Sequence, residues 1–194
     1  MNESVNLEAV RNEALRKLGR NILNFSQIEA AFKELLSISQ LKVTGKNLSD
    51  QSLEQLDRNQ TRLQKQTLGD LAQEYNQKIL RNASQSEPTP DLSETEISLS
   101  YSVKVIYSDP VFLKEQKRKL ASIVAERNKL IHQDLGFLDT SSVEDYHNLI
   151  TLLDEQNPRL LAQLEELKCI IEPMRGFLKA FKDRSKSLDF ILGE

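Results

Sequence analysis

Apolar side chains recur at helical spacing through the first forty residues of the chain. Between residues 7 and 39 they stand three or four positions apart, with charged and amide side chains between them: Leu7, Val10, Leu15, Leu18, Ile22, Phe25, Ile28, Phe32, Leu35 and Leu36. Such a stripe faces a core from one side of an amphipathic helix. The spacing predicts one long helix, or two in line, with Gly19 marking a bend or a close contact.

The pattern weakens in the next forty residues. The polar stretch over residues 43–48 predicts a loop, and residues 48–50 offer the cap chemistry of a helix start. A thinner apolar stripe in a glutamine-rich segment then predicts one or two helices between residues 53 and 80. Residues 82–95 contain several serines and two prolines, which is typical of a turn-rich connection.

The period of the pattern changes to two near residue 96. From Ile97 to Tyr107, apolar side chains alternate with polar ones, and many of the apolar ones are β-branched or aromatic. This alternation predicts an extended strand over residues 96–107. A single strand needs a partner, which is either another segment of this chain or a second copy of it.

Helical spacing returns after this strand. Asp109 and Pro110 form a helix start signal, and the helix should run from Pro110 to about residue 133. Ser141 with Glu144 three positions later predicts a capping box at the start of a further helix.

Two prolines interrupt the pattern of this last helical region. Pro158 predicts a break or kink after Asn157, because proline cannot donate a helix hydrogen bond. The apolar stripe then continues to about Phe181 as a long final helix, with a second kink expected near Pro173. Together these elements predict an all-α helical bundle with one short extended segment near residues 96–107.

The composition fits a single domain without a membrane span. A chain of 194 residues can bury one core, so residues 1–194 are expected to form one domain. No apolar run approaches the roughly 20 residues that cross a bilayer, and the N-terminus lacks the pattern of a secretory signal. The expected location is cytoplasmic. The single cysteine, Cys169, cannot form an internal disulfide and is expected to pack in a helix interface.

The charge balance restricts nucleic-acid binding to a local surface. The net charge is −3 and the isoelectric point is near 5.6, so the whole molecule lacks a strongly basic field. A local patch could come from the basic residues between positions 114 and 129: Lys114, Lys117, Arg118, Lys119, Arg127 and Lys129. From charge alone, a solvated helix face is the simpler interpretation of the lysines.

The candidate chemistry lies in residues 126–132. Arg127 falls inside the apolar stripe of its predicted helix, where it needs a carboxylate, a position at the rim or a wet cleft. Asn128 and His132 stand four positions apart on nearly the same helix face, so a hydrogen bond between them could orient the imidazole. On an ideal helix Arg127 and His132 are about 140° apart. Glu126 is interpreted as a salt-bridge partner of Arg127, with a role in the site as the alternative.

Other histidine or metal chemistry finds little support in the sequence. His147 is the only other histidine and is expected at the surface or between helices. Zinc is not expected, because no cysteine or second ligand stands at suitable spacing. No other cofactor is indicated.

The segment Arg127-Asn128-x-x-x-His132, in an all-α chain that follows it with another long helix, resembles the R-x4-6-H signature of the HEPN superfamily (higher eukaryotes and prokaryotes nucleotide-binding). The motif covers six residues, and the helical layout extends the resemblance loosely over most of the chain. Some toxins of this family carry a tyrosine two residues after the histidine, which the antitoxin modifies. Asp134 stands there in this chain, so the resemblance does not extend to that regulation.

The resemblance implies a homodimeric, metal-independent endoribonuclease with a toxin–antitoxin or phage-defence role. His132 would move protons, Arg127 would stabilise the charge on the phosphorane, and Asn128 would orient His132 or hold a phosphate oxygen. Lys129, Lys119 and Arg118 would bind RNA. The implied partners are RNA, a second copy and an antitoxin or other protein.

Two other interpretations stay open. In a noncatalytic interaction protein, Arg127 and His132 would be structural, and the alternating segment 97–107 would mediate self-association or bind another chain or RNA. A nucleotide-binding module is the third interpretation. It is weakened because the chain has no glycine-rich phosphate loop.

Overall fold

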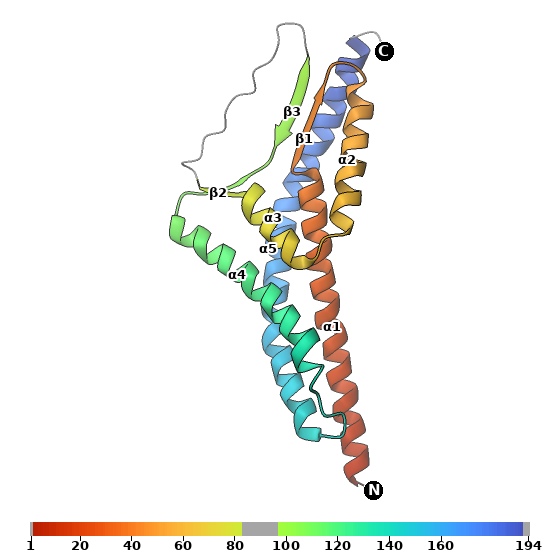
Figure 1. Cartoon of the computed structure of the whole chain (residues 1–194), viewed down its shortest axis with the longest axis vertical. Helices are drawn as coiled ribbons and strands as arrows, with labels where there is room; N and C mark the ends of the chain where they lie inside the picture. Colours follow the sequence, from red (N-terminus) through yellow and green to blue (C-terminus); the bar gives the residue numbers. More distant parts are fainter. Residues whose placement is uncertain (1, 83–96, 192–194) are drawn as a thin grey trace.

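Two long helices dominate the computed structural model, which describes residues 2–82 and 97–191. Helices α1 (Asn2–Ile38) and α5 (Val143–Ile191) lie side by side and run in the same direction, so that the termini stand at opposite ends of the molecule (Figure 1). The 49 residues of α5 extend over about 74 Å at about 1.5 Å per residue. The long helices predicted at both ends of the chain are confirmed, and the first is a single helix.

Buried amide side chains set the alignment of α1 on α5. Asn21 is fully buried, and its Nδ2 donates to the carbonyl oxygen of Leu153 at 2.8 Å and to Oε1 of Gln156 at 3.0 Å. One turn further along, Nδ2 of Asn24 donates to Oδ1 of Asn157 at 2.9 Å. A buried polar group is costly without a hydrogen bond, and these partners meet in only one alignment. The two asparagines therefore fix the register of the parallel pair.

Pro158 lies inside α5 without ending it. Of the break or kink predicted after Asn157, the break is wrong, because α5 continues through Pro158 and Pro173. A proline in a helix removes one hydrogen bond and normally kinks or ends the helix. In this chain the turn before Pro158 is held against α1 by the hydrogen bonds to Leu153 and Asn157. Packing against the neighbouring helix therefore offsets the lost bond.

Shorter helices complete the bundle. Helices α2 (Leu48–Gln64) and α3 (Leu68–Lys78) pack on α1. Helix α4 (Pro110–Lys129) continues into a π-helical turn, η1 (Leu130–Asp134), and lies beside the first half of α5 (Figure 1). The largest fully buried side chains include Ile28, Phe32, Leu35, Leu63, Leu71, Leu153 and Leu160. The predicted helical bundle is confirmed, and no helix in residues 2–82 and 97–191 combines the length and apolar character of a membrane span.

Four short strands form two pairs within the described residues. Strand β1 (Gln40–Thr44) is antiparallel to β3 (Ser98–Ser102), and β2 (Leu80–Asn82) is parallel to β4 (Val105–Tyr107). The predicted extended segment is confirmed as β3 and β4, and both pair within this chain.

The extended segment's partners, β1 and β2, were not expected from the sequence. The loop predicted over residues 43–48 begins only after Thr44, because the alternating burial of β1 is too short to stand out in the pattern. Of the predicted connection over residues 82–95, Asn82 ends β2, and residues 83–95 lie outside the described part.

The predicted helix starts are confirmed in one case and displaced in another. The side chain of Asp109 accepts a hydrogen bond from the Val111 amide at 2.8 Å, as the start signal of α4 predicts. At the start of α5 the capping serine is Ser142, whose Oγ accepts from the Asp145 amide at 3.1 Å. The capping box predicted at Ser141 is thus displaced by one residue.

The start of α2 is capped from the far end of the chain. Asn47 precedes α2 in the left-handed region, with φ +55°, and its side chain makes no cap hydrogen bond. The carboxylate of Asp189, near the end of α5, instead accepts from the amides of Leu48 at 2.7 Å and Ser49 at 2.8 Å. Hydrogen bonding from Ser49 lowers the pKa of Asp189 below its ordinary value of 3.8, against the opposing effect of burial. This contact ties the end of α5 to α2.

Replacing Asp189 with alanine should destabilise the fold in a pH-dependent way. Loss of an N-cap acceptor costs about 0.5–2 kcal/mol, so we expect the free energy of unfolding in urea at neutral pH to fall by about 1 kcal/mol. Because the pKa is depressed in the folded state, this stabilisation is present above about pH 4 and is lost as the pH falls through the folded-state value.

Asp183→Ala, at an exposed position of the same helix, is the matched control and should leave the stability unchanged. Equal losses in the two variants, or a loss for Asp189→Ala that stays constant down to pH 2, would contradict a capping role for Asp189.

Candidate functional site

Helix α4 presents one face to the core and the opposite face to solvent. Gln116, Leu120 and Ile123 are buried, and Leu130 of η1 continues this buried face. Arg127 continues this row of residues, four positions after Ile123, and is partly buried. The position of Arg127 within the apolar stripe is therefore as predicted.

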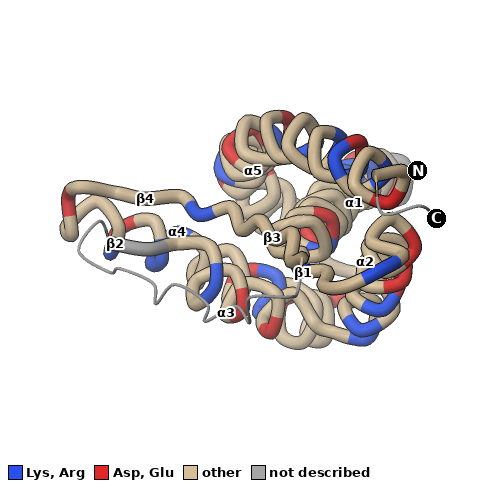
Figure 2. The backbone as a smooth tube through the Cα atoms, turned by 90° about the horizontal axis from the view of Figure 1, so that it is seen from above, with Lys and Arg blue, Asp and Glu red and all other residues tan. Residues whose placement is uncertain are grey.

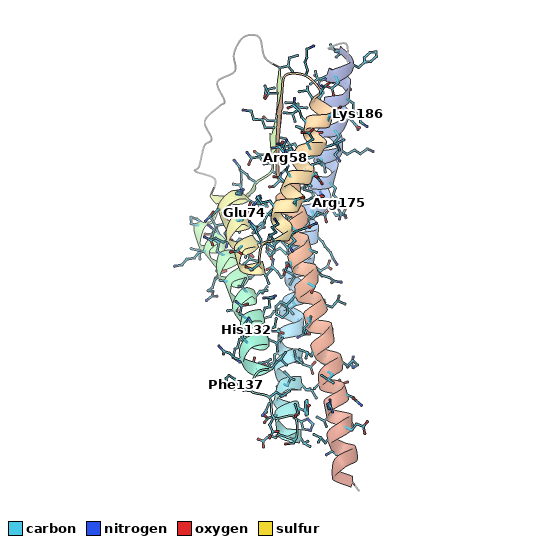
Figure 3. The ribbon with its side chains drawn as sticks, turned by 45° about the vertical axis from the view of Figure 1, so that its right-hand side comes forward. Arg58, Glu74, His132, Phe137, Arg175 and Lys186 are labelled. Carbon is cyan, nitrogen blue, oxygen red and sulfur yellow. The ribbon has the colours of Figure 1, made fainter. Side chains whose placement is uncertain are left out.

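Asn128 and His132 are exposed and line one open depression of about 440 Å³. The two residues therefore share a helix face, as their spacing predicts. Figure 3 shows His132 near the end of α4, with Phe137 in the turn that follows. The site lies on the outer surface of the bundle.

The predicted hydrogen bond between Asn128 and His132 does not form in the described structure. Asn128 Oδ1 instead accepts a long hydrogen bond from Nη1 of Arg127, at 3.4 Å. The helix widens into the π turn at Leu130, and this extra residue in the turn displaces His132 from its ideal α-helical position. His132 is exposed to solvent, and no hydrogen bond within the described residues holds its imidazole.

The charge of Arg127 is not neutralised within the described part of the chain, where no carboxylate lies within 4.0 Å of its guanidinium. The interpretation of Glu126 as the partner of Arg127 is wrong. Glu126 accepts from Nε and Nη2 of Arg159 on α5, at 3.2 and 3.1 Å, because that guanidinium approaches it from the facing helix. Arg127 also does not line the depression of Asn128 and His132. Within one chain, Arg127 and His132 therefore lie next to each other on the surface but not in the same depression.

The three residues predicted to bind RNA lie in different surroundings. Nζ of Lys129 forms an ion pair with Asp134 at 2.5 Å, and Lys129 also lines the depression of His132. Lys119 borders a second hollow between α4 and α5, and Arg118 is exposed. Acidic and basic residues are interspersed along the helices rather than separated onto opposite faces (Figure 2).

Phe137 was not expected from the sequence to belong to the site. Its side chain is 85% exposed, and it borders a hollow of about 430 Å³ next to Lys129 and Asp134. A single aromatic residue in a turn gives no periodic signal, so the pattern of the chain could not single it out. The sequence did not indicate Gln163 either, a buried residue of α5 that lines the hollow between α4 and α5.

The remaining candidates are at the surface. His147 is exposed on α5. Cys169 is exposed as well, so its predicted packing in a helix interface is wrong, because Leu167 and Ile171 take the inward positions of that turn. Among the described residues, no group of three or more histidine, cysteine, aspartate or glutamate side chains could hold a metal ion.

No known family model, curated protein or solved structure matches this chain. The fold is that of a mostly helical bundle with a small amount of strand. The candidate site consists of a solvent-accessible histidine and asparagine at one depression, with an arginine beside them.

Proposed function

We propose that this chain is a metal-independent endoribonuclease of the HEPN type. The observation that carries the proposal is the solvent-open depression lined by Asn128 and His132, next to an arginine whose charge no carboxylate of the described residues neutralises. A histidine can move protons near neutral pH, and an unpaired guanidinium can stabilise a developing negative charge. Both groups are accessible to a polymer that binds at the surface.

The proposed reaction uses the ribose of RNA as the nucleophile. The 2′-hydroxyl loses its proton, its oxygen bonds to the adjacent phosphorus, and the bond from phosphorus to the 5′-oxygen breaks, with a proton passing to the leaving oxygen. His132 moves these protons, and Arg127 stabilises the charge on the phosphorane. Asn128 holds a phosphate oxygen. The products are a 2′,3′-cyclic phosphate and a 5′-hydroxyl end.

The proposal includes a homodimer. Arg127 does not line the depression that holds His132, so one chain does not surround a single phosphate with both groups. A two-fold dimer brings the same surface of two copies together and can set the arginine of one copy opposite the histidine of the other. The exposed ring of Phe137 beside this surface supports such a contact. An antitoxin or other partner in a toxin–antitoxin or phage-defence role would act by covering the same surface.

A noncatalytic interaction protein is the second candidate. The observation that favours it is the pairing of Lys129 with Asp134 beside the exposed Phe137, because this surface combines an exposed aromatic ring with a neutralised charge. Such a surface suits a protein partner at least as well as a phosphate chain. A nuclease would cleave RNA, whereas a noncatalytic interaction protein would leave RNA intact.

Substitution of the site should strongly lower the rate of RNA cleavage without affecting the fold. We expect purified protein to cleave mixed single-stranded RNA in EDTA and to leave 2′,3′-cyclic phosphate ends. Arg127→Ala and His132→Ala should each lower the rate by about 10²–10⁴, the range for loss of a charge-stabilising or proton-transferring group. Cleavage products resolved on denaturing gels, with end-group analysis, give the measurement.

His147→Ala is the matched control, because it removes the other exposed histidine and should leave the rate unchanged. Intact RNA with folded wild-type protein would sink the nuclease proposal and favour the interaction protein. A rate that falls equally in the His132→Ala and His147→Ala variants would contradict the proposed role of His132.

Asp134→Asn should strengthen RNA binding by releasing Lys129 from its ion pair. One more free cation adds about one phosphate contact, so the slope of log K against log salt for single-stranded RNA should steepen by about 0.7. Fluorescence anisotropy at several salt concentrations, in the His132→Ala background, measures this. Asp183→Asn changes the net charge equally at a remote position of α5, and a slope that steepens as much in that variant would refute a local effect.

A further inference from the structure

A second hollow adjoins the depression of His132. It lies between α4 and α5 and has a volume of about 230 Å³. Ser122 and Glu126 line both cavities, so the two hollows share a wall. The apolar side chains of Ile123 and Ala162 also line the second hollow. A chain bound across His132 could therefore place a neighbouring group in this hollow.

Gln163 supplies an unpartnered amide to this hollow. The residue is only 6% exposed, and within the described part of the chain its amide makes no hydrogen bond. The amide also retains some contact with solvent. Among the described residues, the fully enclosed side-chain atoms that lack a hydrogen-bond partner are Gln66 Oε1 and Asn76 Oδ1, and the amide atoms of Gln163 are not among them. Gln163 lines the hollow, which is where its unpartnered amide can meet a ligand or water. Buried amides are normally hydrogen-bonded, and this one is left for a ligand or water.

Gln156 provides an internal comparison. It lies seven positions earlier on α5, two turns away, and is 3% exposed. Its amide oxygen accepts from Asn21 at 3.0 Å and belongs to the α1–α5 interface. The two glutamines are similarly buried, and only Gln163 lacks a partner. A structural role explains Gln156 and does not explain Gln163.

The charged groups around the hollow define the chemistry of its ligand. Glu166 lines it and forms no ion pair within the described residues, so its carboxylate can accept a hydrogen bond. Lys119 stands at the same hollow as an exposed cation. The volume is below the roughly 300–1,000 Å³ of sites for drug-sized molecules, so the hollow suits a ligand the size of a single ring system.

We propose that this hollow is a base subsite that receives one unpaired nucleobase with an exocyclic amino group, from an RNA strand whose phosphate lies at His132. The amide of Gln163 offers a donor and an acceptor side by side, as an amide does when it pairs with a base edge, and Glu166 accepts from the amino group. Ile123 and Ala162 contact the ring. Uracil carries a carbonyl oxygen where cytosine carries the amino group, so uracil is disfavoured. The subsite rests on the proposed function, which supplies the RNA strand.

Side-chain amide NMR of the full chain tests the subsite without any cleavage. The Nε2 resonances of Gln163 are identified as those that disappear in Gln163→Leu, and CMP and UMP serve as probes. CMP should shift them in both the wild-type and His132→Ala proteins, with at least tenfold tighter binding than UMP. Gln163→Leu should lose at least tenfold in CMP affinity, whereas Gln60→Leu, at an exposed position of α2, should bind as the wild type does.

Equal affinity for CMP and UMP, or unchanged CMP binding by folded Gln163→Leu, would overturn the subsite. RNA cleavage that persists with the same base preference in Gln163→Leu would also overturn it and would leave the nuclease standing. If CMP binds as expected and RNA stays intact, the subsite is supported as a nucleotide site and the nuclease proposal fails.

Discussion

The parallel pairing of α1 with α5 is the constraint on which the rest of the molecule depends. Asn21 is fully buried and finds its hydrogen-bond partners, the Leu153 carbonyl and Gln156, in one register only. A shift of either helix by one turn would leave these groups unpaired in an apolar interface, at about 1–3 kcal/mol for each. The same contacts hold the turn before Pro158, so α5 runs on beyond a residue that normally ends a helix.

The fixed position of α5 then determines both ends of the fold. At one end Asp189 reaches back to cap α2, which joins the last helix to the second. Nearer the start of α5, Arg159 pairs with Glu126 and places α4 beside it. The depression at His132 and the hollow at Gln163 lie on either side of this α4–α5 contact. The proposed site therefore depends on contacts that begin with a pair of buried asparagines.

The sequence predicts the features that extend over many residues and misses those that join distant segments. The helical stripe of α1, the alternation of β3 and β4 and the start signal at Asp109 are local patterns, and all are confirmed. The continuity of α5 at Pro158, the cap from Asp189 and the pairing of Glu126 with Arg159 depend on partners far away in the chain, which no local pattern contains. In the site, periodicity places Asn128 and His132 on one face, whereas the π turn that contains His132 has no sequence signal.

The central claim is that Arg127 and His132 act on the same phosphate across a dimer. Co-expression of Arg127→Ala and His132→Ala chains tests it most directly, because a mixed dimer then holds one intact pair of groups, with the arginine from one chain and the histidine from the other. Random association makes about half of the dimers mixed, so about a quarter of the wild-type cleavage rate should return. A mixture as inactive as either variant alone would contradict a shared site.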